Sequence, residues 1–90
     1  MKRMHVFISG RVQGVAFRHY TVNTARSLNL GGWVRNLGDG RVESVFEGGD
    51  DPVDAMLAWC KKGPSMAHVT QVDVQEEPCS GQYEDFKIRY

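Results

Sequence analysis

The stretch that decides the fold is residues 5–28, HVFISGRVQGVAFRHYTVNTARSL, because its hydrophobic period changes halfway along. From His5 to Gly10 apolar side chains alternate, which is typical of a β-strand. From residue 17 onward, apolar or small residues recur at the steps of four, four and three that a helix requires: Phe17, Thr21, Ala25 and Leu28. The stretch therefore predicts a strand, a loop that contains glycine, and a helix.

Downstream of this stretch, the pattern predicts a hairpin and a second helix. Residues 32–37 and 41–47 are predicted to be strands that Gly38-Asp39-Gly40 joins in a tight turn. We expect Asp51 to cap the second helix and Pro52 to lie in its first turn. The apolar face of that helix is formed by residues at helical spacing: Val53, Met56, Leu57 and Cys60.

The order of the elements predicts the fold. Gly63-Pro64 is expected to end the second helix, residues 69–74 predict a fourth strand, and residues 86–90 a short last one. The order β-α-β-β-α-β is typical of the ferredoxin-like α+β sandwich, an antiparallel sheet with both helices on one face. We expect residues 1–90 to form a single domain. In this topology the first and second strands run parallel, with the third between them, so their carboxyl ends share one edge.

The composition is that of an ordinary globular protein. Charged residues make up 24% of the chain and the net charge is zero, so we expect no nucleic-acid partner, which normally requires a basic excess. The charges are unevenly distributed, because residues 1–41 carry seven Lys or Arg and one acid. The longest apolar run, Val6-Phe7-Ile8, is too short to span a bilayer. We therefore expect no membrane partner and a cytoplasmic location.

The cysteines and histidines predict neither a metal site nor a cofactor. Cys60 and Cys79 lie outside any CxxC spacing, and His5, His19 and His68 form no i,i+4 pair. We expect both thiols to be free, with Cys60 in the core.

The loop from Gly10 to Arg18 leads from the first strand directly into a helix N-terminus. Unpaired backbone N–H groups and the helix dipole favour an anion at such a place. Arg18 lies in the first turn and can bind phosphate oxygens bidentately. A side chain in place of Gly14 would obstruct the anion. On spacing alone, an ordinary surface arginine remains the alternative for Arg18.

Asn36 ends the second strand at the sheet edge where this loop lies. One intervening strand separates the two by about 10 Å, which leaves room for a phosphate and a water. An amide donates and accepts at once, which suits a group that holds a water nucleophile. The alternative, an Asn that satisfies the following turn, is favoured by the residues alone. Trp33 and Arg35 face the other side, where Trp33 is expected to cover the sheet as a partly buried aromatic.

Two segments together resemble the signatures of the acylphosphatase family. Residues 8–18, ISGRVQGVAFR, resemble the first, hydrophobic-x-G-x-V-Q-G-V-x-F-R. Residues 32–36, GWVRN, followed by Gly40-x-Val42 and Gly48, resemble the second. The remaining helix and strands match the family in length and order.

The resemblance implies a metal-independent hydrolase that converts an acyl phosphate into a carboxylate and inorganic phosphate. Carried over to this sequence, Arg18 would bind the phosphate and Asn36 would orient the attacking water. The phosphate-binding loop would be completed by the backbone of five residues: Gln13, Gly14, Val15, Ala16 and Phe17. The implied partner is a small-molecule acyl phosphate, and we expect the chain to act as a monomer.

Two other functions share this order of elements. RNA-recognition domains carry a basic and aromatic third strand, whereas residues 41–47, RVESVFE, are acidic with one aromatic. A non-catalytic phosphate- or small-ligand-binding module of the same fold is the second alternative. The presence of both Arg18 and Asn36 argues against it.

Overall fold

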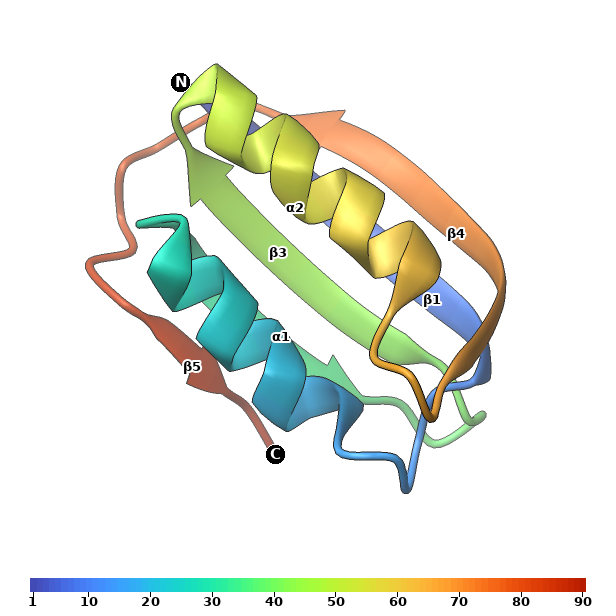
Figure 1. Cartoon of the computed structure of the whole chain (residues 1–90). Helices are drawn as coiled ribbons and strands as arrows, with labels where there is room; N and C mark the ends of the chain where they lie inside the picture. Colours follow the sequence, from blue (N-terminus) through green and yellow to red (C-terminus); the bar gives the residue numbers. More distant parts are fainter.

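The computed structural model describes residues 1–90 and contains five strands and two helices (Figure 1). In chain order these are β1 (Lys2–Arg11), α1 (Phe17–Ser27), β2 (Gly31–Asn36), β3 (Val42–Gly48), α2 (Asp50–Lys62), β4 (His68–Glu77) and β5 (Phe86–Ile88). Both helices cover the same face of a single sheet. The predicted ferredoxin-like α+β arrangement is confirmed.

The strands pair in the order β4-β1-β3-β2-β5. β3 runs antiparallel to both β1 and β2, so these two strands are parallel to each other, as predicted. Val42, the first residue of β3, lies opposite Ile8 on one side and Asn36 on the other. The carboxyl ends of β1 and β2 therefore meet at one edge. The short β5 adds to β2 in parallel, so the complete sheet is mixed rather than wholly antiparallel.

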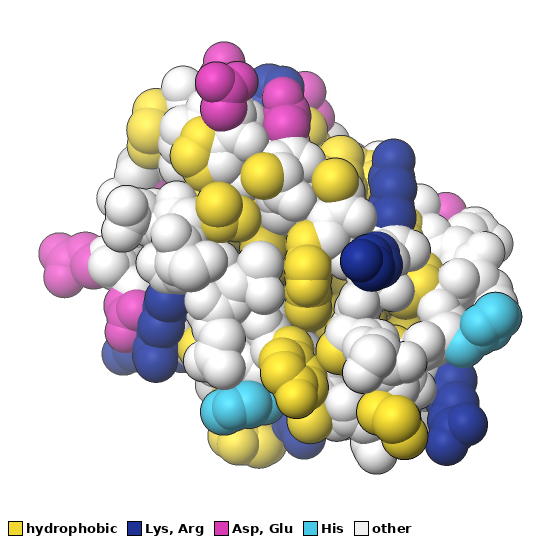
Figure 2. All heavy atoms as spheres, in the orientation of Figure 1, with side chains coloured by type: hydrophobic (Ala, Val, Ile, Leu, Met, Phe, Trp, Pro, Cys, Tyr) yellow, Lys and Arg dark blue, Asp and Glu magenta, His cyan; other side chains and the backbone are white.

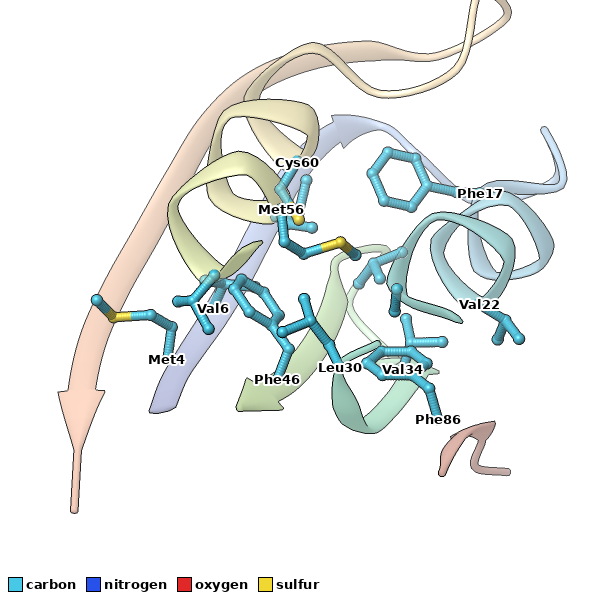
Figure 3. Close-up of a cluster of buried hydrophobic side chains, with 14 of the residues drawn as sticks. Met4, Val6, Phe17, Val22, Leu30, Val34, Phe46, Met56, Cys60 and Phe86 are labelled. Carbon is cyan, nitrogen blue, oxygen red and sulfur yellow. The ribbon is translucent and has the colours of Figure 1, made fainter. Parts of the chain in front are cut away.

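The core lies between the sheet and the two helices (Figure 3). Fifteen buried hydrophobic residues form one cluster, to which the sheet contributes Val6 and Phe46 and α2 contributes Met56 and Cys60. The predicted apolar face of α2 is confirmed, since Val53, Met56 and Cys60 are completely buried and Leu57 is partly buried against the core. Burial raises the pKa of the Cys60 thiol to about 12, so this cysteine serves packing rather than chemistry. Both cysteines are free, as predicted.

The expected start of α2, with Asp51 as the N-cap, is wrong by two residues. The helix begins at Asp50, Gly49 occupies the N-cap position, and no side chain caps it. Asp51 thus lies in the first turn, where its charge interacts favourably with the helix dipole without a capping hydrogen bond. Asp50 accepts instead from the N-terminal ammonium group at 3.2 Å.

The open face of the sheet, which the helices leave uncovered, carries a network of paired polar side chains. Trp33 is only 7% exposed there, so its prediction as an aromatic that covers the sheet is confirmed. His5 contacts two carboxylates, with Nε2 2.6 Å from Glu43 Oε2 and Nδ1 2.9 Å from Glu77 Oε2. Arg35 Nε donates to the other Glu43 oxygen at 2.6 Å. His5, Arg35 and Glu43 therefore all have hydrogen-bond partners on this face.

Candidate functional site

A small hollow lies where the loop between β1 and α1 meets the end of β2. Its volume is about 160 Å³, and it is lined by Val12, Gln13, Gly14, Ala16, Phe17, Arg18, His19, Asn36 and Ile88. The structure thus brings together Arg18 and Asn36, which are 18 positions apart in the sequence. No aspartate or glutamate lines the hollow, so no negatively charged side chain in its wall repels an anion.

The acidic side chains lie elsewhere. On the helix-covered face they are seen where α2 begins and beside the segment that precedes β5, and none is seen around the N-terminal end of α1 (Figure 2). A larger hollow of about 450 Å³ opens at the opposite edge of the sheet, but three carboxylates line it: Glu47, Glu84 and Asp85. Size alone would favour that hollow, whereas charge favours the smaller one as an anion site.

The backbone of the loop is shaped to present N–H groups. Gly14 has φ 74° and Ala16 has φ 59°, so both residues adopt the left-handed conformation. For Ala16, the N-cap of α1, this conformation is sparsely populated and costs about 1–3 kcal/mol. A Cβ at Gly14 would meet no protein atom within 4 Å, so glycine is required there for its φ rather than by crowding within the chain.

The N–H groups of this loop have no acceptor within the chain. The first backbone N–H at the start of α1 to find one is that of Tyr20, which donates to Ala16 O at 3.1 Å. The backbone N–H groups from residue 13 to residue 19 make no hydrogen bond to another residue. No side chain caps the helix either. A row of free donors at the positive end of a helix dipole is a ready anion site.

Arg18 brings an uncompensated positive charge to the hollow. It forms no salt bridge, unlike Arg26 and Arg35, which pair with carboxylates. Its guanidinium carbon lies 5.4 Å from the centroid of the exposed Tyr90 ring, a contact that leaves the positive charge without a counter-ion. The guanidinium can therefore bind an anion without first breaking an ion pair.

Asn36 contributes a polar atom without a partner. Its Oδ1 is buried and accepts no hydrogen bond in the chain. The turn that follows is held by other groups, because Arg41 N–H donates to Asp39 Oδ1 and Leu37 N–H donates to Arg41 O. The alternative role of Asn36, satisfying this turn, thus has no support in the geometry. An unsatisfied buried acceptor costs about 1–3 kcal/mol, which favours a water or ligand hydrogen bond at this position.

The side chains of three other loop residues, Gln13, Val15 and Phe17, make contacts within the chain. Gln13 Nε2 donates to Leu37 O at 2.8 Å and to Arg41 O at 2.9 Å. Val15 packs against the hydrophobic core, and Phe17 is 2% exposed within it. Gln13 and Phe17 line the hollow and can offer a ligand their free backbone N–H groups, whereas Val15 is not among its lining residues.

Three residues that line the hollow received no role from the sequence: Val12, His19 and Ile88. His19 immediately follows Arg18 in α1, and its position in the first turn was the only available signal. Ile88 reaches the site because β5 pairs with β2, which brings the end of the chain to this edge. No sequence pattern near residue 88 indicates that contact.

Apart from Arg18 and His19, no residue that lines the hollow has an ionisable side chain. No group of three or more His, Cys, Asp or Glu residues is arranged to hold a metal ion. Cys79 lies far along the chain, where burial and a hydrogen bond to Glu47 raise the pKa of its thiol. No helix of the structure is long and apolar enough to span a membrane.

Comparison with known proteins assigns the family. The acylphosphatase family model matches residues 4–88. The chain is 56% identical over 89 residues to an acylphosphatase of Syntrophobacter fumaroxidans, and the match covers 99% of this chain and 92% of that one. The crystal structure of acylphosphatase from Bacillus subtilis superposes with a TM-score of 0.95 at 34% identity, with complete coverage of both chains.

An acylphosphatase structure from Coxiella burnetii gives a TM-score of 0.92 at 40% identity, covering 98% of this chain and 92% of that one. All of these matches cover almost the whole chain, and the chain belongs to the acylphosphatase family.

Proposed function

We propose that this acylphosphatase binds the phosphoryl group of its substrate with Arg18 and the backbone N–H groups of residues 13–17, and that Asn36 orients the attacking water. One observation carries the proposal: the unpartnered Asn36 Oδ1 borders the same hollow as the free N–H groups and the unpaired guanidinium. Acceptor, donors and positive charge are the three elements that water attack on a phosphoryl group uses.

In the proposed reaction, Asn36 Oδ1 accepts a hydrogen bond from a water molecule and turns the water's lone pair towards phosphorus. A bond forms between the water oxygen and phosphorus, while the bond from phosphorus to the acyl oxygen breaks. The carboxylate leaves with that electron pair, and the protons of the water end on the phosphate and in solvent. A carboxylate is a good leaving group, so no strong general acid is needed.

Arg18 and the N–H groups neutralise charge on the phosphoryl oxygens as this happens. Because the donors lie on one short segment, they are arranged before the substrate arrives and require no reorganisation during the reaction. Such preorganised positioning and charge neutralisation account for most of the catalysis in phosphoryl transfer.

The acyl part of the substrate has room beside the phosphate. A second hollow of about 420 Å³ shares His19 and Ile88 with the first and runs between α1 and β5. It is lined partly by apolar side chains, among them Val22 and Tyr90, and by no carboxylate. We place the acyl group there, outside the smaller hollow that holds the phosphate.

The test is steady-state hydrolysis of acetyl phosphate by the purified chain, with phosphate release measured in the presence and absence of EDTA. Turnover that EDTA leaves unchanged is expected. Phosphate binding without any turnover would instead identify a non-catalytic phosphate-binding module.

We further propose that the chain acts as a monomer in the cytoplasm and without a cofactor. Light scattering on the eluting peak of a size-exclusion column tests whether it is a monomer.

A further inference from the structure

The sheet leaves a gap beside the proposed site. β3 begins at Val42, where Ile8 and Asn36 lie opposite it on either side. Beyond Val42, β1 continues to Arg11 with β4 as its only partner. No strand therefore connects the loop that follows β1 to the turn that follows Asn36. The ladders with β3 position the two segments only as far as Ile8 and Asn36, and beyond these residues no backbone hydrogen bond between strands joins them.

The side chain of Gln13 fills this gap. Its Nε2 donates to Leu37 O at 2.8 Å and to Arg41 O at 2.9 Å, so one amide group bonds both ends of the turn. Arg41 O also accepts from Leu37 N–H at 2.8 Å, the bond that closes the hairpin. Leu37 directly follows Asn36, and Gly14 directly follows Gln13. The two hydrogen bonds thus connect the proposed water-orienting residue to the start of the phosphate-binding loop.

We infer that Gln13 is a positioning residue: its side chain fixes the phosphate-binding loop relative to Asn36 and does not itself contact the phosphate. The inference rests on the roles proposed above for Arg18 and Asn36. The water and the phosphoryl group are held by different segments, and a misplacement of about 1 Å between reacting groups can lower a rate by about 10²-fold. The two hydrogen bonds donated by the Gln13 amide connect these segments through a side chain.

The primary test is Gln13→Met, which keeps the length of the side chain and removes both donors. We expect kcat for acetyl phosphate to fall about tenfold, while the inhibition constant of inorganic phosphate changes less than about twofold. Phosphate affinity is preserved because the free N–H groups and Arg18 follow Gln13 on one continuous segment. The matched control is Gln71→Met, which removes an amide bonded to exposed Asp73 on β4 and should leave both constants unchanged.

A double-mutant cycle with Asn36→Ala distinguishes positioning from other roles. If Gln13 acts through Asn36, Gln13→Met should have less than about twofold further effect once Asn36 is alanine. Full additivity would overturn the inference. A rise in the phosphate inhibition constant equal to the loss of kcat/KM would instead make the Gln13 side chain a ligand. A lower melting temperature with unchanged kcat would make its role structural.

A measurement on the unmodified chain covers the case in which Gln13→Met does not fold. The Gln13 side-chain amide protons should exchange with solvent much more slowly than those of Gln71 in an NMR experiment, and exchange as fast as Gln71 would overturn the inference. These outcomes are separable from failure of the proposed function, which would appear as an unmodified chain without turnover or an Asn36→Ala variant with normal turnover.

Discussion

The two polar regions of this molecule differ in whether their hydrogen-bonding groups have partners. On the open face of the sheet, His5, Glu43 and Arg35 are all paired, and Glu43, which is only 5% exposed, has hydrogen-bond partners in both His5 and Arg35. At the edge where β1 and β2 end, Arg18 has no counter-ion and Asn36 Oδ1 has no donor. Paired groups stabilise a fold, whereas unpaired groups are available to a substrate. The difference favours the edge where β1 and β2 end, the proposed active edge, more clearly than the size of any hollow does.

The largest effect is expected from removing the unpaired charge. Arg18→Ala should lower kcat/KM for acetyl phosphate by about 10³-fold, because the side chain is proposed to bind the phosphoryl group before and during the reaction. Inorganic phosphate should lose its inhibition at the same time. The melting temperature should stay close to that of the unmodified chain, since no ion pair is broken. A variant that keeps its phosphate affinity would refute this role of Arg18.

The second effect separates orientation of the water from binding of the phosphate. Asn36→Ala should lower kcat by about 10²-fold and leave phosphate inhibition nearly unchanged, because the amide is proposed to contact chiefly the water. It should not destabilise the chain, since the lost oxygen has no partner in the fold. Steady-state kinetics and phosphate inhibition, measured on one preparation, test both statements. Near-normal turnover would return Asn36 to a role at the end of the strand.

The sequence predicted those parts of the fold that hydrophobic periodicity reports. Residues 5–28 showed the change from strand to helix, and the parallel placement of the first two strands followed from the order of the elements. β4 was predicted over residues 69–74 but runs from His68 to Glu77. It is an edge strand with mostly exposed side chains, so its ends carry polar residues that periodicity cannot detect.

Local sequence signatures predicted which residues form the proposed site. They did not predict the hydrogen bonds that those residues make or lack. The residues alone favoured a role for Asn36 in the turn. In the folded chain Asn36 Oδ1 has no partner, which argues against that role. Gln13 was placed in the phosphate-binding loop, yet its amide is bonded to carbonyls 24 and 28 positions away. Contacts at such separations depend on how the strands pair, which a linear pattern does not contain.

A smaller effect, on stability alone, is expected on the open face. Hydrogen bonds from His5 and Arg35 together hold the pKa of Glu43 below its ordinary value of 4.5, although burial acts to raise it. A depressed pKa stabilises the fold above the ordinary value, and this contribution is lost as the pH falls through the lower, folded-state value. Glu43→Gln should therefore lower the free energy of unfolding at pH 7 by about 1–3 kcal/mol.

Chemical denaturation between pH 3 and pH 7 checks this prediction. The loss of stability below about pH 4.5 should be shallower in Glu43→Gln than in the unmodified chain. Part of the slope should remain, because the pKa of Glu47 is also lowered by hydrogen bonds from Cys79 and two backbone N–H groups that outweigh its burial. Turnover per folded molecule should be unchanged. An identical pH slope would show that the Glu43 pairing contributes nothing to stability.

The smallest effect tests whether the two regions are independent. A ligand that binds only the folded chain stabilises it by RT ln(1 + [L]/Kd), which is about 1.4 kcal/mol for phosphate at ten times its Kd. The unmodified chain and Glu43→Gln should both gain this amount, because the open face does not contact the phosphate. Arg18→Ala should gain almost nothing, and EDTA should change none of the three values. Thermal denaturation with and without phosphate measures all of them. If Glu43→Gln lost the phosphate effect while remaining folded, the open face would be coupled to the active edge, and the separation of stabilising from reactive polar groups would fail.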